Sequence, residues 1–232
     1  GIVGYVGLEQ AAPVLLQGLG KLEYRGYDSA GIAVYQNGIF TIKTKGRLTD
    51  LKEKIKKEDI TLSGKIGIGH TRWATHGAPS DVNSHPHSSE NGRISVVHNG
   101  IIENYMELKE MLLKKGRKFV SETDTEIIAQ LFDDCYNGDM VETMIEVIGK
   151  IRGAYALGVL CTEHPDQIVA VRKDSPLLVG LGEKENYIAS DIPALLEYTR
   201  DYYLLEDNEI VLLKQNSVTL FDLNKKEIKK EV

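Results

Sequence analysis

Short apolar segments separated by glycine-rich turns run along most of the chain, and they predict more strands than helices. The segments 1–7, 66–69 and 94–97 are each apolar and too short for a buried helix. Asn37-Gly38 lies between two further segments, 32–35 and 39–42, and this dipeptide is a strong hairpin signal. Further strands are expected at 155–161, 167–172, 177–181, 187–190, 202–205, 209–214 and 217–222.

Apolar residues at helical spacing predict about five helices among these strands. They are expected at 10–23, 51–57, 104–115, 121–136 and 139–149, with a short one near 193–198. Helices and strands do not alternate strictly, so the pattern disfavours a doubly wound parallel sheet and favours a layered α+β fold. The charged tail, 225–232, is compatible with the start of a linker.

Composition narrows the function classes. The chain has 232 residues, a hydrophobic fraction of 42% and a net charge of −6, which suits one large or two small domains and argues against a nucleic-acid platform. No apolar run is long enough for a bilayer, and we expect no secretory signal. Cys135 and Cys161 fall in apolar helix and strand patterns and are expected to be inert core thiols of a reducing, cytoplasmic protein.

The densest chemistry lies in His70-Thr-Arg-Trp-Ala-Thr-His-Gly77, directly after a predicted strand. Loops at strand ends are where a rigid scaffold presents binding groups. The guanidinium of Arg72 is suited to binding a ligand carboxylate through two parallel hydrogen bonds. A surface salt bridge is the alternative, and the residues leave both open.

Four histidines, His70, His76, His85 and His87, occur within 18 positions and raise the question of a metal. No Cys, Asp or Glu stands at zinc-ligand spacing among them, and no HExxH helix is present. We therefore expect them to serve as hydrogen-bonding and loop-stabilising side chains, with no metal.

Two further sites each admit a structural and a functional interpretation. Asn99-Gly100 is either a turn or an oxyanion hole, in which the Asn amide and the Gly N–H converge on a developing negative charge. Asp124 is either a helix cap or the partner of a ligand ammonium. An arginine and an aspartate held apart would together recognise an α-amino acid.

Six ordered segments carry a specific family resemblance that covers essentially the whole chain. They are GIVGYVG at 1–7, EYRGYDSAG at 23–31, HTRWATHG at 70–77, HPH at 85–87, HNGIIEN at 98–104 and SETDTE at 121–126. In these segments the chain resembles the glutaminase domains of glucosamine-6-phosphate synthases, also called glutamine–fructose-6-phosphate aminotransferases. These belong to the class II glutamine amidotransferases, other members of which resemble the EYRGYDSAG and HTRWATHG segments less well.

The resemblance implies an N-terminal-nucleophile hydrolase fold, which is an α+β sandwich of four layers in the order αββα, with two antiparallel sheets. It implies one glutamine amidotransferase type 2 domain over 1–232, with the sugar isomerase domain of the full-length enzyme absent from this chain. The family nucleophile is a cysteine directly before the Gly-Ile-Val-Gly stretch, so we expect a cysteine immediately before Gly1. Its own α-amine would serve as the general base.

The resemblance also assigns site residues and partners. Asn99 and Gly100 would form the oxyanion hole, Arg72 would bind the glutamine carboxylate, and Asp124 would bind its ammonium. The resemblance gives Trp73, Thr75, His76 and His85 the task of shaping the pocket and its closing loop, and Arg25 that of organising the terminal residue.

The implied reaction is hydrolysis of L-glutamine to L-glutamate and ammonia, without a cofactor. In the full-length enzyme, a possible homodimer, the ammonia would serve conversion of fructose 6-phosphate to glucosamine 6-phosphate by the sugar isomerase domain. Neither nucleic acid nor a membrane is an expected partner. Two alternatives stay open: a catalytically silent domain that binds glutamine or glutamate, if the cysteine is absent, and the glutaminase domain of another class II amidotransferase.

Overall fold

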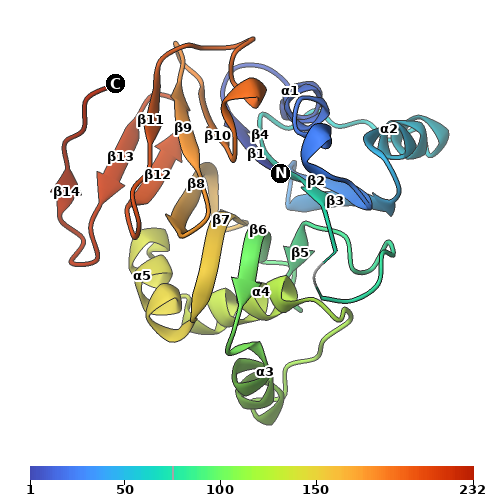
Figure 1. Cartoon of the computed structure of the whole chain (residues 1–232), viewed down its shortest axis with the longest axis vertical. Coiled ribbons are helices and arrows are strands. Elements are labelled where there is room, and N and C mark those ends of the chain that lie inside the picture. Colours follow the sequence, from blue (N-terminus) through green and yellow to red (C-terminus); the bar gives the residue numbers. More distant parts are fainter. Residues whose placement is uncertain (75) are drawn as a thin grey trace.

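The computed structural model describes residues 1–74 and 76–232 and, for Arg25, the backbone alone. In this part of the chain two sheets of seven strands each pack face to face, and helices cover both outer faces (Figure 1). All named strand pairs are antiparallel. This is the layered α+β fold that the sequence pattern favoured, with the four layers that the family resemblance implied.

The first sheet contains the chain's first strand at its centre. Its strands are β1 (Ile2–Val6), β2 (Ser29–Tyr35), β3 (Ile39–Lys45), β4 (Ile66–Arg72), β9 (Leu178–Leu181), β10 (Asn186–Ala189) and β11 (Tyr202–Leu204). They are ordered β11-β9-β10-β1-β4-β2-β3. The N-terminus therefore lies in the middle of a sheet, beside β4, and not at an outer edge (Figure 1).

The second sheet is built from the middle and the end of the chain. Its strands are β5 (His87–Ser88), β6 (Ile94–Ile102), β7 (Gly153–Cys161), β8 (His164–Lys173), β12 (Ile210–Lys214), β13 (Val218–Phe221) and β14 (Glu227–Ile228). They are ordered β14-β13-β12-β8-β7-β6-β5. The pairing of β14 with β13 places Glu227 and Ile228, two residues of the charged tail, at the edge of this sheet.

Five α-helices in the described residues supply the outer layers. They are α1 (Ala11–Gly20), α2 (Leu48–Lys57), α3 (Tyr105–Lys114), α4 (Asp124–Cys135) and α5 (Met140–Lys150), with 3-10 turns η1 (Glu23–Arg25) and η2 (Ile192–Ala194). Helices α1 and α2 pack on the first sheet, and α3, α4 and α5 on the second. A third hydrophobic cluster fills the space between the sheets. The helix expected near 193–198 is only the 3-10 turn η2.

Strand β4 shows how the alternating pattern produces this layering. Ile66 and Ile68 point into the layer between the sheets, because alternate side chains of a strand face opposite sides. The intervening positions are glycines facing α1. A Cβ on Gly67 would lie 2.9 Å from Leu15, and one on Gly69 would lie 3.0 Å from Leu19. The two glycines therefore let α1 lie directly on the strand.

Two strands run further than the sequence pattern predicted, and both extensions matter for the site. Strand β4 was expected to end at 69 but continues to Arg72, and β6 was expected to end at 97 but continues to Ile102. Pairing with neighbouring strands keeps these polar residues in the sheets: Arg72 lies opposite Ser29 of β2, and Gly100 lies opposite Tyr155 of β7. Hydrophobicity alone therefore places the ends of both strands too early.

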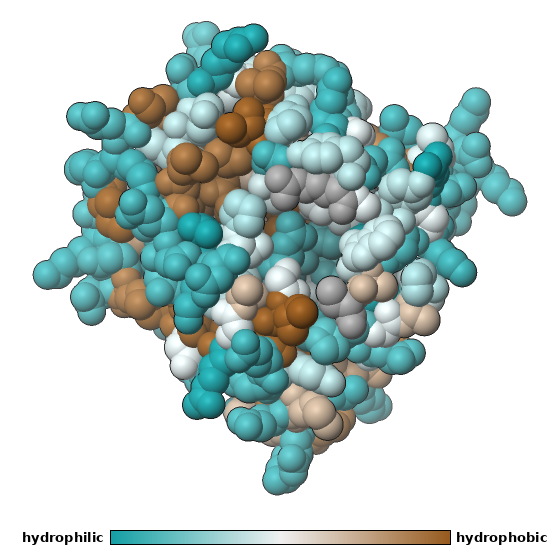
Figure 2. Space-filling model, viewed as in Figure 1, coloured by the Kyte–Doolittle hydropathy of each residue, from teal (hydrophilic) through white to brown (hydrophobic). Residues whose placement is uncertain are grey.

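The surface adds little to the functional interpretation. The face in Figure 2 is mainly hydrophilic near its centre and carries a hydrophobic patch over the strands at its left. Among the described residues, no helix has the length and apolar character needed to cross a membrane.

Candidate functional site

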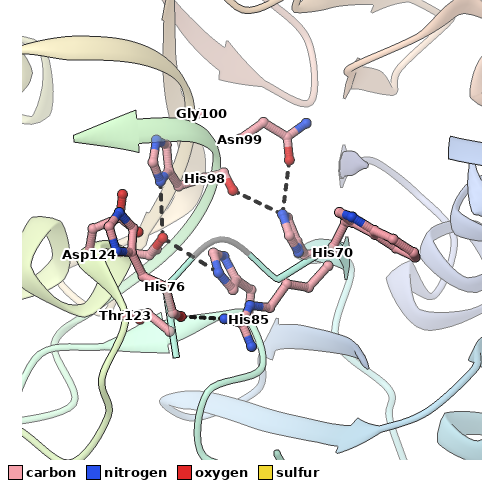
Figure 3. A pocket seen from close by; sticks show the side chains of 11 residues that line it. His70, His76, His85, His98, Asn99, Gly100, Thr123 and Asp124 are labelled. Carbon is pink, nitrogen blue, oxygen red and sulfur yellow. Dashed lines mark hydrogen bonds between the residues drawn. The ribbon is translucent and has the colours of Figure 1, made fainter. Parts of the chain in front are cut away.

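One small polar cavity brings together most of the residues singled out in the sequence. It has a volume of about 60 Å³ and lies where the ends of β4 and β6 meet the N-terminus of α4 (Figure 3). Arg72, Trp73, His76, His85, Asn99, Gly100 and Asp124 all line it. Thr75 lies outside the described residues, as does the side chain of Arg25.

Strand alternation explains why two strands from different sheets point polar groups at the same space. His70 and Arg72 share a face of β4 with Ile68, which packs between the sheets. On β6, Asn99 shares a face with Val97, which packs in the same layer. The polar ends of both strands therefore lie on the same strand faces as the hydrophobic residues between the sheets. The cavity forms at the edge of that layer, where the side chains on these faces become polar.

One nitrogen of the Arg72 guanidinium is hydrogen-bonded to the backbone, and another has no partner. Its Nη2 donates to the backbone oxygens of His76 and Gly77, the latter at 2.9 Å, and so holds the segment that follows β4. Its Nη1 is buried and has no hydrogen-bond partner. Burial lowers the pKa of Arg72, and the carboxylates of Asp28 and Asp124 act in the opposite direction. Arg72 is thus no surface salt bridge but a buried cation with one unused donor edge.

Asp124 is the first residue of α4, yet its carboxylate does not cap that helix. The cap is Thr123, whose hydroxyl accepts from the Glu126 N–H. The Asp124 Oδ2 instead accepts from the Ile102 N–H at 2.9 Å and ties α4 to the end of β6. Since Asp124 is 3% exposed and lines the cavity, its other oxygen is available to a ligand cation there.

Asn99-Gly100 is not a turn, because both residues lie inside β6 opposite Ala156 and Tyr155 of β7. Gly100 has φ +115°, and a Cβ there would lie 2.2 Å from the Ala154 carbonyl oxygen. Only glycine fits this backbone without displacing β7. The Asn99 side-chain oxygen lies 3.0 Å from His70 Nε2, so the residue is held from below by β4 (Figure 3).

The histidines form a buried cluster beneath the cavity. The rings of His70 and His85 stack at 4.1 Å, and His85 meets His87 edge-on at 4.8 Å. His87 Nε2 lies 2.8 Å from the Thr123 hydroxyl. Burial lowers the pKa of all three rings well below the ordinary histidine value. Within the described residues, no group of three His, Cys, Asp or Glu side chains is arranged to hold a metal ion.

His76 and Trp73 border the cavity from the segment after β4. The His76 ring contacts Tyr105 at 4.7 Å, which links this segment to α3. The Trp73 side chain is 68% exposed. A Cβ on Gly26 would lie 2.7 Å from the indole, so the ring rests against that backbone.

The structure adds residues that the sequence reasoning missed. The Asp28 carboxylate accepts from the Ala74 N–H, and its backbone N–H donates to the Arg72 oxygen at 2.7 Å. His98 points toward α4, where its Nδ1 lies 3.0 Å from the Thr125 hydroxyl. Thr123 lines the cavity beside Asp124. Asp28 belongs to the 23–31 segment and His98 to the 98–104 segment. These family segments therefore contained both residues, but the sequence did not show which contacts they make.

Both cysteines are buried, as expected from their apolar surroundings. Burial raises the pKa of Cys135 to about 11 and also raises the pKa of Cys161. Neither thiol lines the cavity. Both therefore fit the predicted role of inert core residues.

The cavity therefore presents an unused guanidinium edge, a carboxylate oxygen and a side-chain amide from three different elements. A guanidinium and a carboxylate held apart by a rigid scaffold match the two charges of an α-amino acid. An amide on the opposing strand can donate to an oxygen further along such a ligand.

Comparisons with known proteins give the family. The profile described as "Glutamine amidotransferase domain" matches residues 41–222. The glutamine–fructose-6-phosphate aminotransferase (isomerizing) of Clostridium tetani is 61% identical over 233 residues, and that of Thermus thermophilus is 53% identical over 232. Each alignment covers 100% of this chain and 38% of the relative. The chain thus spans well under half the length of these relatives.

Solved structures show the same fold at lower identity. The glutamine phosphoribosylpyrophosphate amidotransferase of B. subtilis superposes with a TM-score of 0.81 at 24% identity, over 99% of this chain and 50% of that one. A second structure, of the allosteric regulatory enzyme of purine biosynthesis, superposes with a TM-score of 0.83 at 24% identity, over 96% of this chain and 48% of that one. These likenesses show that the chain shares its fold with a large part of each of these two enzymes.

Proposed function

This chain belongs to the family of glutamine amidotransferase domains, and on that premise we propose that it is a single glutaminase domain over 1–232. It hydrolyses the side-chain amide of L-glutamine to L-glutamate and ammonia. The observation that carries this proposal is the convergence of Arg72, Asp124 and Asn99 on one cavity from three elements. The Arg72 Nη1 edge takes the α-carboxylate, and the free oxygen of Asp124 takes the α-ammonium.

We propose that a cysteine directly before Gly1 is the nucleophile, and the strand register supports its position. Ile2 pairs with His70, and Gly1 exchanges backbone hydrogen bonds with Thr71 at 2.7 and 3.0 Å. Continued by one residue, this register sets the preceding position opposite Arg72. Alternation gives that position the face of Ile2, which packs between the sheets. A cysteine there points to the layer that also contains Asn99.

The reaction then needs no separate histidine or aspartate base. The α-amine of the cysteine takes the thiol proton, and the sulfur attacks the side-chain carbonyl carbon of glutamine. The Asn99 amide and the Gly100 N–H stabilise the oxyanion, and removing one such donor costs about 10²–10³ in kcat. The C–N bond breaks, the amine returns the proton to the leaving nitrogen, and ammonia departs. Water cleaves the thioester, which releases glutamate and the thiol.

The segment 72–80 acts as the loop that admits the substrate. The cavity of about 60 Å³ has room for about four to six water molecules, which is fewer than the number of non-hydrogen atoms in glutamine. Substrate entry therefore requires the segment held by Arg72 to move outward. In this proposal Trp73, Thr75, His76 and His85 shape the pocket and its loop, and Arg25 organises the terminal residue.

The role of the longer polypeptide follows from its relatives. We propose that this chain is the first part of a glutamine–fructose-6-phosphate aminotransferase, whose remaining sugar isomerase domain uses the ammonia to convert fructose 6-phosphate to glucosamine 6-phosphate. We place the protein in the cytoplasm, where reducing conditions suit a free catalytic thiol. A homodimer of the full-length enzyme stays a prediction.

The test is turnover by a polypeptide that carries the cysteine before Gly1. Incubation with L-glutamine should release glutamate and ammonia in equal amounts, and the same polypeptide with serine at that position should bind glutamine without releasing either. Binding of glutamine without glutamate release by the cysteine form would overturn the catalytic proposal and leave a binding domain. Failure of both forms to bind glutamine or glutamate would refute the site itself.

A further inference from the structure

His70 lies beneath the proposed oxyanion hole and contacts two oxygens with one ring nitrogen. Its Nε2 is 2.9 Å from the backbone oxygen of His98 and 3.0 Å from the side-chain oxygen of Asn99 (Figure 3). The three residues come from facing strands of the two sheets, β4 and β6. None of the proposed chemical steps uses this imidazole.

These contacts fix the tautomer of His70. A backbone carbonyl oxygen can only accept a hydrogen bond, so the Nε2 facing His98 has to carry the proton. The other nitrogen, Nδ1, is buried and has no hydrogen-bond partner, so a second proton placed there would have no acceptor. Burial accordingly lowers the pKa of His70 well below the ordinary value. The ring is therefore a neutral donor at Nε2.

The tautomer in turn fixes the side-chain amide of Asn99. Because His70 Nε2 donates, the Asn99 atom that faces it has to be the oxygen, and the NH₂ group is turned to the opposite side (Figure 3). A terminal amide rotates between two nearly equivalent orientations when nothing distinguishes them. With the reverse orientation, Asn99 would present a carbonyl oxygen to the developing oxyanion and repel it.

The imidazole is well held for this task. His70 is 3% exposed, and its ring stacks on His85 at 4.1 Å with the planes 13° apart. Its backbone is anchored by pairing with Ile2 on one side and Gly31 on the other. Neither the ring nor its strand can swing away from Asn99 without disturbing the first sheet.

We propose that His70 is a positioning residue of the glutaminase reaction, which orients the Asn99 amide so that its NH₂ group faces the oxyanion. This inference rests on the proposed function and deepens it. His70 itself touches neither glutamine nor the reacting atoms. Its effect falls on the chemical step and not on binding, because the oxyanion is absent from bound glutamine and forms only as the sulfur attacks.

The experiment uses the cysteine-bearing polypeptide with two substitutions at one position. His70→Leu removes the donor, and we expect kcat for glutamine hydrolysis to fall about 10- to 100-fold, with KM changed by less than about threefold. His70→Gln supplies an N–H near the position of Nε2 and should recover about tenfold of that loss. Thermal melting and glutamate affinity establish that each variant is folded.

A double-mutant cycle separates positioning from general structural damage. In an Asn99→Ala background the amide is already absent, so adding His70→Leu should lower kcat by no more than about threefold. The matched control is His87→Leu, which removes an equally buried imidazole of the same cluster that contacts Thr123 instead of Asn99. Its effect on kcat should be the same in both backgrounds.

The outcomes distinguish this inference from the function on which it rests. An Asn99→Ala variant with unchanged kcat would remove Asn99 from the oxyanion hole and refute both. A large loss in Asn99→Ala, with His70→Leu equally harmful in both backgrounds, would overturn the positioning role alone. Failure of His70→Gln to recover activity while it binds glutamate normally would also overturn it.

Discussion

Replacing Asp124 by asparagine tests the amino-acid site without any need for the nucleophile. The substitution keeps the size of the side chain and removes its charge. In the native protein Oδ2 accepts from the Ile102 N–H at 2.9 Å, and Asp124 lines the cavity. Asparagine can satisfy Ile102 only with its single oxygen, so its NH₂ group takes the place of the oxygen proposed to bind the ligand ammonium.

The size of the effect follows from this exchange. A hydrogen bond to a charged group contributes about 1.5–3 kcal/mol, and every 1.4 kcal/mol is tenfold in affinity. Losing the carboxylate oxygen should therefore raise the Kd for L-glutamate about 10- to 150-fold. Repulsion between the new NH₂ group and the ammonium favours the upper part of this range.

Isothermal titration calorimetry of this chain with L-glutamate and L-glutamine measures the effect directly. The matched control is Asp133→Asn, because Asp133 lies on the same helix and is equally buried but pairs with Arg93 and Arg117 at 2.6 and 2.9 Å. Asp133→Asn should lower stability and leave the Kd unchanged. Asp124→Asn should raise the Kd and leave the stability unchanged.

A ligand without the α-ammonium makes the test specific. The wild-type chain should bind L-glutamine much more tightly than its deaminated analogue, and Asp124→Asn should bind the two about equally. The reasoning is refuted if Asp124→Asn binds L-glutamate within threefold of wild type, or if it weakens both ligands by the same factor.

Three further predictions concern charge and protonation. Arg72→Lys should raise KM for glutamine at least about tenfold, because an ammonium cannot both hold the loop carbonyls and bind a carboxylate in two places; an unchanged KM would remove Arg72 from the substrate site. His70 and His85 stay neutral in the folded protein, because burial lowers their pKa, but they take up protons in the unfolded chain below about pH 6.5. The free energy of unfolding should therefore fall as the pH drops from 7 to 5, by up to about 1.4 kcal/mol per pH unit for each histidine. A urea midpoint that does not change with pH would contradict this. Cys135 and Cys161 should resist thiol reagents at pH 8 until the protein is unfolded, and rapid labelling of the native chain would show that burial does not protect them.

Much of the architecture could be read from local pattern. The hairpin at Asn37-Gly38 forms as predicted between β2 and β3, and both residues have positive φ values, of 55° and 112°. Helices α3, α4 and α5 begin and end within a few residues of the predicted bounds. These features depend on neighbours in sequence, so a single sequence contains what they need.

The ends of β4 and β6 could not be predicted in this way. His70, Thr71 and Arg72 are polar, and hydrophobic periodicity assigns them to a loop, yet cross-strand pairing with Ile2 and Ser29 keeps them in the sheet. Asn99-Gly100 has the composition of a turn but is paired along β7. Ladder hydrogen bonds from distant strands outweigh the local preference in both cases.

The sequence by itself determined which chemical groups this protein possesses, in what order, and which family it resembles. Only the tertiary structure decided that Asp124 bonds to β6 and leaves capping of its helix to Thr123, and that His70 donates to Asn99. The physical reason is that each of these contacts joins residues from different elements. Their geometry is set by how two sheets and a helix pack together, and no spacing along the chain contains it.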